Sequence, residues 1–310
     1  MDFDHCTVIY LLGGQQADFH AEGIRRKRRK SSAEMEKNMT RWKKTAWCLL
    51  FVVIGLIWLM PVFYLINVSV KPAAEFYTQG VFSITLHPTL DNFAESWKKI
   101  GTFFLNSVVN VVVSVPLGIL IASLGAYALA RLPMKGRGFF VTLFMMGMLL
   151  PVHVTLLPNY ITLQKLNLLN SRAGILLLYT VFNIPFAMYM LQGFFMGLSR
   201  EIEESAIIDG AGSFQIYIHI ALPMARPAVI ISGLLCFIAV WNDLVFAITF
   251  VQNNIKMPIT AGLLQFMGEF TSHYEKITAG ILLSALPVFI LYLFFQKQIM
   301  EGMAEGAVKG

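Results

Sequence analysis

Polar side chains embedded in apolar stretches are the residues of this chain best suited to bind something. They are three separate asparagines and one Trp-Asn-Asp group, namely Asn106, Asn110, Asn183, Trp241, Asn242 and Asp243. Amides and carboxylates among apolar side chains need hydrogen-bonding partners, because an unbonded polar group there is costly. They are candidates for contact with a polar solute. For the Trp241-Asn242-Asp243 group, hydrogen bonding between helices or to a partner chain is an equally supported alternative.

Patterns that indicate catalysis or metal binding do not occur in the sequence. It contains no H-E-x-x-H, no G-x-S-x-G and no G-x-x-x-x-G-K-[ST] phosphate loop. Cys6, Cys48 and Cys236 have no paired spacing, so they indicate neither a disulfide framework nor a zinc site. His153 is expected to pack or to lie at an interface. We therefore predict no catalytic residue and no metal site, which disfavours an intramembrane enzyme.

The composition indicates an integral membrane protein. Hydrophobic residues make up 56% of the 310 residues and charged residues 14%, whereas soluble domains carry about 25% charged residues. A helix of about 20 apolar residues crosses a hydrocarbon core of roughly 30 Å, and lipid offers the backbone no partners, so spanning runs must be helical. Six runs are long enough, at about Trp47–Val68, Phe103–Leu129, Phe139–Tyr160, Ile175–Phe195, Ala228–Phe250 and Thr278–Phe295. The predicted fold class is all-α, a polytopic membrane protein with six transmembrane helices at residues 45–296.

Basic residues predict the orientation. If both termini are cytoplasmic, most of the 24 Lys and Arg residues lie inside, as the positive-inside rule requires. Residues 1–44 then form a cytoplasmic extension, and residues 297–310 form a cytoplasmic tail. The basic run I-R-R-K-R-R-K follows a short apolar patch, the reverse of a secretory signal. We expect residues 1–34 to be dispensable, with Met35 a possible natural start.

Residues 199–224 are a polar interruption between two apolar runs on the predicted inner side. Ser199 is placed to cap a helix whose first turn is acidic. Gly210 and Gly212 can supply the backbone that ends this helix. Ser213 is placed to cap a second segment that Pro223 stops. Composition and spacing by themselves equally allow an ordinary amphipathic interfacial loop.

The order E-S-A-I-I-D-G-A, followed by F-Q-I-Y-I-H-I-A-L-P, resembles the EAA loop of bacterial ATP-binding-cassette (ABC) importer permeases. In that loop E-A-A is followed by three residues, Gly, nine residues, Ile, one residue and Leu-Pro. The matching positions are Glu204, Ala206, Asp209, Gly210, Ala211, Ile220, Leu222 and Pro223, with Ser205 replacing an Ala. N-S-V-V-N at 106–110, L-G-A-Y-A-L-A-R at 124–131, W-N-D at 241–243 and the ending E-G-M-A-E-G-A-V-K-G resemble the carbohydrate, maltose-permease-like branch.

This resemblance implies a type I permease core in a bacterial plasma (inner) membrane, forming half of a transport pathway for a sugar or oligosaccharide. The implied partners are a second permease subunit, two ATPase subunits and an extracellular or periplasmic solute-binding protein, with lipid around them and no nucleic acid. The chain itself then holds no cofactor, because ATP and Mg belong to the ATPase subunits. The loop residues, Ser205 included, couple to the ATPase, and Trp241 can stack on a sugar face.

Other transport mechanisms stay open. The alternatives are a permease for another solute class and an ion-coupled secondary transporter, although the latter usually has internal repeats and several intramembrane acids. Alternating access requires helices that break or bend, and the natural points are Pro116 with Gly118, Pro151, Pro185 and Pro287. In the tail, Gly302, Gly306 and Gly310 suggest an extended backbone that reaches between the ATPase subunits.

Overall fold

The computed structural model describes residues 43–80, 82–269 and 273–308. Every regular element in these ranges is helical, as the fold class predicted. Most of the predicted N-terminal extension, Met35 and Gly310 lie outside the described residues. The chain divides into two compact units, Met1–Tyr64 and Leu65–Gly310. In the first unit the described part belongs to the apolar helix Lys43–Ser69, which matches the first predicted span.

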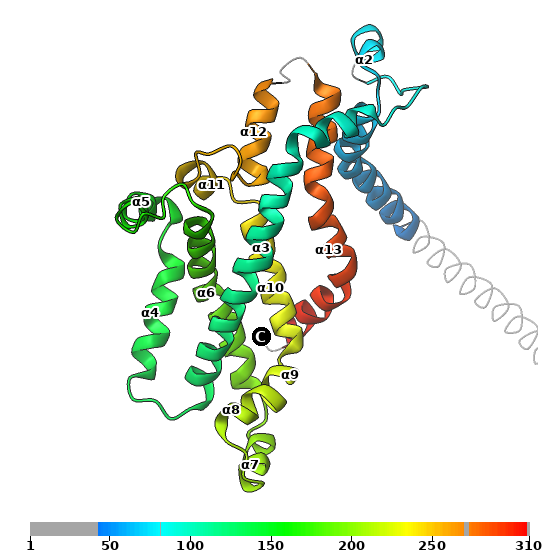
Figure 1. Ribbon diagram of the computed structural model, residues 1–310. Coiled ribbons are helices and arrows are strands. Elements are labelled where there is room, and N and C mark those ends of the chain that lie inside the picture. Colours follow the sequence, from blue (N-terminus) through cyan, green and yellow to red (C-terminus); the bar gives the residue numbers. More distant parts are fainter. Residues whose placement is uncertain (1–42, 81, 270–272, 309–310) are drawn as a thin grey trace, which may run out of the picture. The chain divides into compact units, whose positions relative to one another are not determined.

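The second unit contains three further helices that are long and apolar enough to cross a membrane (Figure 1). These are α3 (Asp91–Arg131), α6 (Arg172–Gly197) and α13 (Tyr274–Val308). They confirm the second, fourth and sixth predicted spans. The shorter helices are α2 (Ala73–Gln79), α4 (Arg137–Leu149), α5 (Leu156–Lys165), α7 (Arg200–Ile208), α8 (Ser213–Ile216), α9 (Leu222–Met224), α10 (Arg226–Trp241), α11 (Val245–Phe250) and α12 (Ile259–Glu269).

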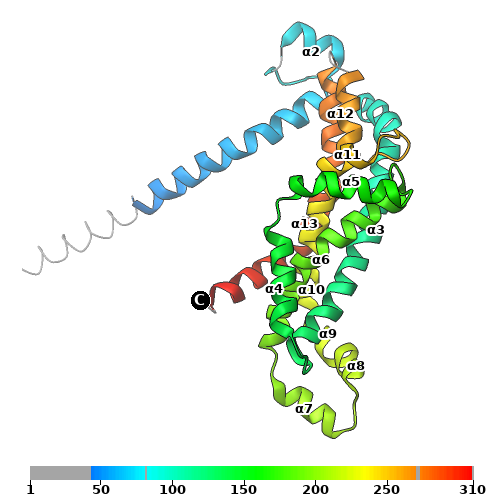
Figure 2. The ribbon, with the colours of Figure 1, turned by 90° about the vertical axis from the view of Figure 1, so that its left-hand side faces the viewer.

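The third predicted span is a bent pair of helices. α4 ends at Leu149, and the 3₁₀ turn η1 (Val152–Thr155) leads into α5 at an angle of 97° to α4 (Figure 2). Pro151 lies at the bend, as predicted. It lacks an N–H and pushes the preceding residue, Leu150, into extended backbone with φ −71° and ψ 120°.

The fifth predicted span is also broken, and here the prediction of one run over Ala228–Phe250 is wrong. α10 ends at Trp241, and α11 begins only at Val245. The Asp243 carboxylate accepts the backbone N–H groups of Phe246 at 3.3 Å and Ala247 at 3.1 Å. It thereby satisfies donors that a helix start leaves free. A side chain predicted to bind solute therefore starts a new helix.

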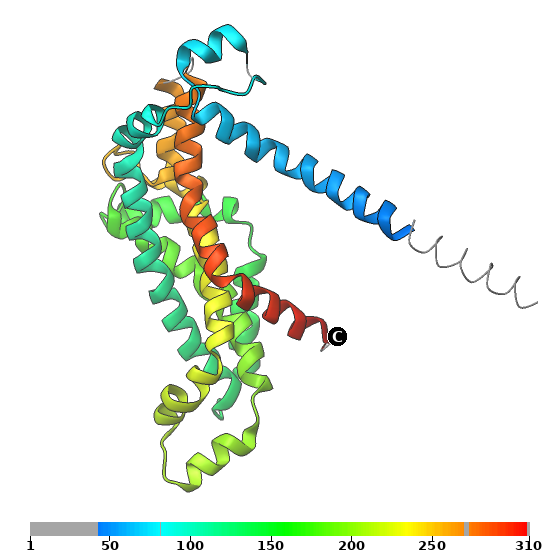
Figure 3. The same ribbon diagram turned by 90° about the vertical axis from the view of Figure 1, so that its right-hand side faces the viewer.

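The other predicted break points lie inside continuous helices. Pro116 is within α3, Pro185 within α6 and Pro287 within α13. The prediction of an extended tail is wrong for the residues that the structure describes, because α13 continues to Val308 (Figure 3). Adding residues to an existing helix avoids the cost of nucleation, and a glycine weakens the helix by only about 1 kcal/mol.

Small residues let α3 and α6 pack closely. Ala122 and Ala126 of α3 are fully buried. Gly118 faces the Thr180 carbonyl, and a Cβ on Gly125 would overlap the Met188 side chain. Because helices in lipid associate mainly through van der Waals contact, this seam fixes the centre of the second unit.

We expect two glycines of α6 to respond oppositely to alanine. A Cβ on Gly174 would overlap the Leu168 carbonyl, whereas a Cβ on Gly193 has no atom within 4 Å. Gly174→Ala should therefore destabilise the folded chain by about 1–3 kcal/mol through overpacking, and Gly193→Ala should be neutral or stabilise it by up to about 1 kcal/mol. Thermal unfolding midpoints in detergent measure both effects. Equal midpoints for the two variants would contradict the packing described at Gly174.

Candidate functional site

The 199–224 loop begins with α7, which ends at a left-handed glycine. Gly210 has φ +86°, and its N–H donates to the Ile207 carbonyl at 3.0 Å. The N–H of Ala211 reaches back to the Ala206 carbonyl at 2.9 Å. These two bonds form a Schellman motif, which a glycine at the left-handed position favours. The predicted role of Gly210 in ending the first helix is confirmed.

The two predicted serine caps are wrong in detail. Ser199 occupies the N-cap of α7 with extended backbone, but its side chain makes no capping hydrogen bond. Ser213 is already helical, and Gly212 is the N-cap of α8. The Gln215 side chain accepts the Gly212 N–H at 2.9 Å and satisfies it. Gln215 thus satisfies the N–H of the N-cap residue, a different donor from those that a Ser213 cap would have satisfied.

Pro223 does not stop the second segment as predicted. The chain stays helical from Ser213 to Met224, and the bend of 75° into α10 follows at Ala225. A π-helical turn, η2 (Tyr217–Ala221), precedes the proline. The Leu222 N–H donates to the carbonyl of Tyr217, five residues back. This wider spacing admits a residue that lacks an N–H donor.

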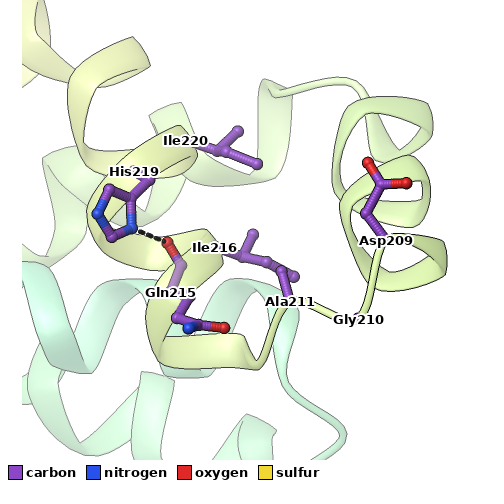
Figure 4. Close-up of a pocket in the computed structure, with 7 residues that line it drawn as sticks. All are labelled: Asp209, Gly210, Ala211, Gln215, Ile216, His219 and Ile220. Carbon is purple, nitrogen blue, oxygen red and sulfur yellow. Dashed lines mark hydrogen bonds between the residues drawn. The ribbon is translucent and has the colours of Figure 1, made fainter.

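A hollow of about 360 Å³ lies within the loop (Figure 4). Asp209, Gly210 and Ala211 line it from the end of α7, and Gln215, Ile216, His219 and Ile220 line it from α8 and η2. His219 Nδ1 lies 3.1 Å from the Gln215 carbonyl oxygen. Ile207, Ile208 and Phe214 are large, exposed apolar side chains of the same loop. The loop therefore presents an opening and apolar surface to a partner.

Three of the predicted coupling residues, Asp209, Gly210 and Ala211, line this hollow, as does Ile220 of the matching motif. Glu204, Ser205 and Ala206 lie on α7, and the Ser205 hydroxyl donates to the Ile202 carbonyl at 2.9 Å. Leu222 and Pro223 lie on α9, at the far end of the loop. The structure thus distributes the motif over both helical segments of the loop.

An ion pair that the sequence did not reveal joins this loop to α3. Arg131 Nε lies 3.2 Å from Glu203 Oε1, and the two side chains are 6% and 14% exposed. The Arg131 guanidinium also donates to the Leu198 carbonyl, just before α7. The sequence signals were an arginine that ends an apolar helix and an acid in the first turn of α7. Only the fold brings them together.

Asn106 is held by protein groups. Its amide nitrogen donates to the carbonyls of Ile255 at 2.7 Å and Met257 at 2.9 Å, and its oxygen accepts from Arg172 at 2.6 Å. These bonds tie α3 to the start of α6 and to the segment before α12. Asn106, predicted to lie on the solute path, thus makes three hydrogen bonds within the protein.

Trp241 and Asp243 are also engaged inside the protein. The Trp241 indole N–H donates to the Ser284 carbonyl at 3.0 Å. Phe237 stacks on its ring at 5.6 Å with an interplanar angle of 12°, and Phe104 packs edge-on. The Tyr179 hydroxyl donates to Asp243 at 2.9 Å. The indole is therefore largely buried in this subunit, although Trp241 also borders the groove that Asn242 lines.

The remaining three asparagines keep hydrogen-bonding capacity. The amide nitrogens of Asn110 on α3 and Asn183 on α6 are buried without a partner among the described residues. Asn242 is exposed and lines a groove of about 690 Å³. The groove lies between α10, α12 and α13, and its other polar lining side chains include Thr260, Ser284 and Tyr292.

Known proteins resemble the chain over most of its length. The model of the family described as binding-protein-dependent transport system inner membrane component matches residues 114–302. The probable ABC transporter permease protein YurM of Bacillus subtilis is 36% identical over 225 residues, covering 72% of this chain and 74% of that protein. The diacetylchitobiose uptake system permease protein NgcG of Streptomyces coelicolor is 30% identical over 264 residues, covering 84% and 87%.

Among solved structures, a bacterial ABC transporter involved in the import of the acidic polysaccharide alginate has a chain that superimposes with a TM-score of 0.73. The identity is 26%, and the match covers 83% of this chain and 96% of that chain. With the helical spans, the 199–224 loop and these matches together, the chain belongs to the family of binding-protein-dependent transport system inner membrane components.

Proposed function

We propose that this chain is a permease subunit of an ABC importer that carries a sugar or oligosaccharide. The observation that supports this most is the 199–224 loop, in which the EAA-type residues form a rigid turn, an adjoining hollow and exposed apolar side chains. The sugar class is supported by the names of the relatives, one a diacetylchitobiose permease and one an alginate importer.

The loop is proposed to contact an ATPase subunit, with Glu204, Ser205, Ala206, Asp209, Gly210 and Ala211 nearest the contact and Leu222 and Pro223 bracing it. The Arg131–Glu203 pair connects α7 to α3. Movement of the ATPase therefore reaches the α3–α6 seam through a charged, buried link. ATP and Mg would be bound by the ATPase subunits.

The proposed assembly contains a second permease, two ATPase subunits and a solute-binding protein, in a bacterial inner membrane. Both termini are proposed to be cytoplasmic, because this orientation keeps most Lys and Arg residues inside. It also puts the 199–224 loop on the side where ATP is available.

Solute contact is proposed for Asn242, Asn110 and Asn183. Asn242 is exposed in the groove between α10, α12 and α13, and the other two amides are buried with unused donors. A sugar offers hydroxyls that both donate to and accept from an amide. Asn106, Trp241 and Asp243 would hold the helices that shape this path.

Gly210→Pro should abolish coupling. Proline cannot adopt φ +86° and removes the N–H that bonds to Ile207. Gly212→Ala is the matched control, because Gly212 has φ −73° and its Cβ would meet only Gln215, at 3.8 Å. Copurification of the ATPase subunits and solute-stimulated ATP hydrolysis in proteoliposomes should fall for the first variant alone. Unchanged coupled hydrolysis in Gly210→Pro would overturn the proposed contact.

Glu203→Gln should uncouple the complex as well, because it leaves the Arg131 cation buried without its anion. Breaking a buried pair on one side destabilises by about 3–5 kcal/mol at full burial. Glu201→Gln, at an exposed position of the same helix turn, is the control. The double variant Arg131→Glu with Glu203→Arg should recover part of the transport rate. If the double variant is no better than the two single variants, the pair does not transmit force.

Two asparagine variants should separate structure from solute contact. Asn106→Ala should lower the thermal midpoint of the complex, since Arg172 and two carbonyls lose a buried partner at about 1–3 kcal/mol each. Asn242→Ala should leave the midpoint unchanged and raise the apparent KM for sugar uptake up to about tenfold, the worth of one hydrogen bond. Unchanged uptake kinetics in Asn242→Ala would remove this residue from the path.

A further inference from the structure

The segment between α2 and α3 turns its apolar side chains outward. Phe82, Ile84 and Leu86 are 80%, 65% and 78% exposed. The intervening Ser83 and Thr85 are half-buried. Leu90 at the start of α3 is exposed too. We call Phe82, Ile84, Leu86 and Leu90 the apolar ridge. Soluble surfaces normally show the opposite alternation, so this amount of exposed apolar area suits an apolar environment.

Polar bonds on the inner side hold the segment in this register. The fully buried Lys71 donates to the Ser83 carbonyl at 2.6 Å, to the Ser83 hydroxyl at 2.8 Å and to the Gly80 carbonyl at 3.1 Å. Asn67 donates to the Ser83 carbonyl at 2.9 Å and accepts the Thr85 N–H at 3.2 Å. A shift of the segment by one residue would break these bonds. The hydrogen bonds therefore fix which side chains point outward.

Further hydrogen bonds of the same segment involve Glu75, Val70 and Asn92. The Thr85 hydroxyl donates to this buried carboxylate at 2.7 Å. Thr89 donates its N–H to the Val70 carbonyl at 2.8 Å, and Asn92 donates to the carbonyls of Ser69 and Lys71, each at 2.9 Å. The segment is therefore clamped against the last turn of the helix Lys43–Ser69 and against the first turn of α3.

These bonds also connect the ridge to the end of the first span. Asn67, Ser69 and Lys71 are the residues at which the apolar run of the first span ends. A span ends where hydrocarbon gives way to the headgroup region. Because Asn67 and Lys71 bond directly to Ser83, the ridge lies beside the residues at which the apolar run of this span ends.

The chemistry of the ridge fits lipid better than protein. No Asp, Glu, Lys or Arg occurs between Glu75 and Asp91. Protein interfaces usually carry a polar rim with hydrogen bonds around an apolar centre, whereas burial in the headgroup and acyl boundary requires only apolar area.

We propose that the apolar ridge inserts into the bilayer leaflet at which the first span ends and anchors the junction between that span and α3. The proposed anchor is stabilised by burial of apolar side chains, so it should insert equally well into neutral and anionic lipids. It fixes the height of Asn92 and the first turn of α3, from which the long α3 helix runs to Arg131.

Site-directed spin labels test the proposal on the full chain in phosphatidylcholine vesicles. Cys6, Cys48 and Cys236 are first replaced by Ser or Ala, and a label is placed at Ile84→Cys, at Leu86→Cys or at Lys98→Cys. Lys98 is exposed in the charged first part of α3 and is the matched control. The labels at 84 and 86 should collide several-fold more with oxygen and less with a water-soluble nickel chelate than the label at 98.

A second variant separates the anchor from a simple folding defect. Ile84→Ser with Leu90→Ser keeps the polar bonds described above, so its thermal midpoint should stay unchanged while the label at 86 moves toward the nickel chelate. Vesicles containing phosphatidylglycerol should give the same collision ratios. Water accessibility at 84 and 86 equal to that at 98 would overturn the proposal. Shielding that arises only when a second permease or a solute-binding protein is added would overturn it too, and would assign the ridge to that protein.

Discussion

Lipid supplies no hydrogen bonds to a polypeptide backbone, and this constraint accounts for two helix breaks in the described part of the chain. Where α10 ends, the Asp243 carboxylate takes the first N–H groups of α11. At the elbow between α4 and α5, Pro151 brings no N–H that would need a partner. At these two breaks a side chain accepts the free N–H groups, or a proline removes one of them, so few backbone donors are left without a partner.

The hydrogen bonds also distinguish polar residues that join helices from polar residues that keep unused donors or acceptors. Asn106 uses both ends of its amide to join α3, α6 and the segment before α12. Asn242 follows the last turn of α10, where the broken span opens into a groove. The break is therefore both a structural joint, made by Asp243, and the place where an amide becomes accessible.

A short series of contacts joins the loop at 199–224 to the long helices α3 and α6. Gly210 and the Schellman bonds keep the end of α7 fixed relative to Ala206 and Ala211. Glu203, about one helical turn before Ala206, forms an ion pair with Arg131 at the end of α3. Small residues of α3 in turn pack closely on α6. Each joint is a short contact between rigid helices, which suits a part that must move as a body.

The sequence by itself determined what depends on neighbours along the chain. Six apolar runs, the left-handed turn at Gly210 and the elbow at Pro151 follow from hydropathy and backbone sterics, and these are local properties. The sequence did not determine the break after Trp241, the N-cap at Gly212 with its N–H bonded to Gln215, or the helical continuation of α13 to Val308. Nor did it separate Asn106 from Asn242 or pair Arg131 with Glu203. Those outcomes were decided by the tertiary structure, because they depend on which distant groups the packed helices bring within hydrogen-bonding distance, or on competition between local alternatives of nearly equal energy.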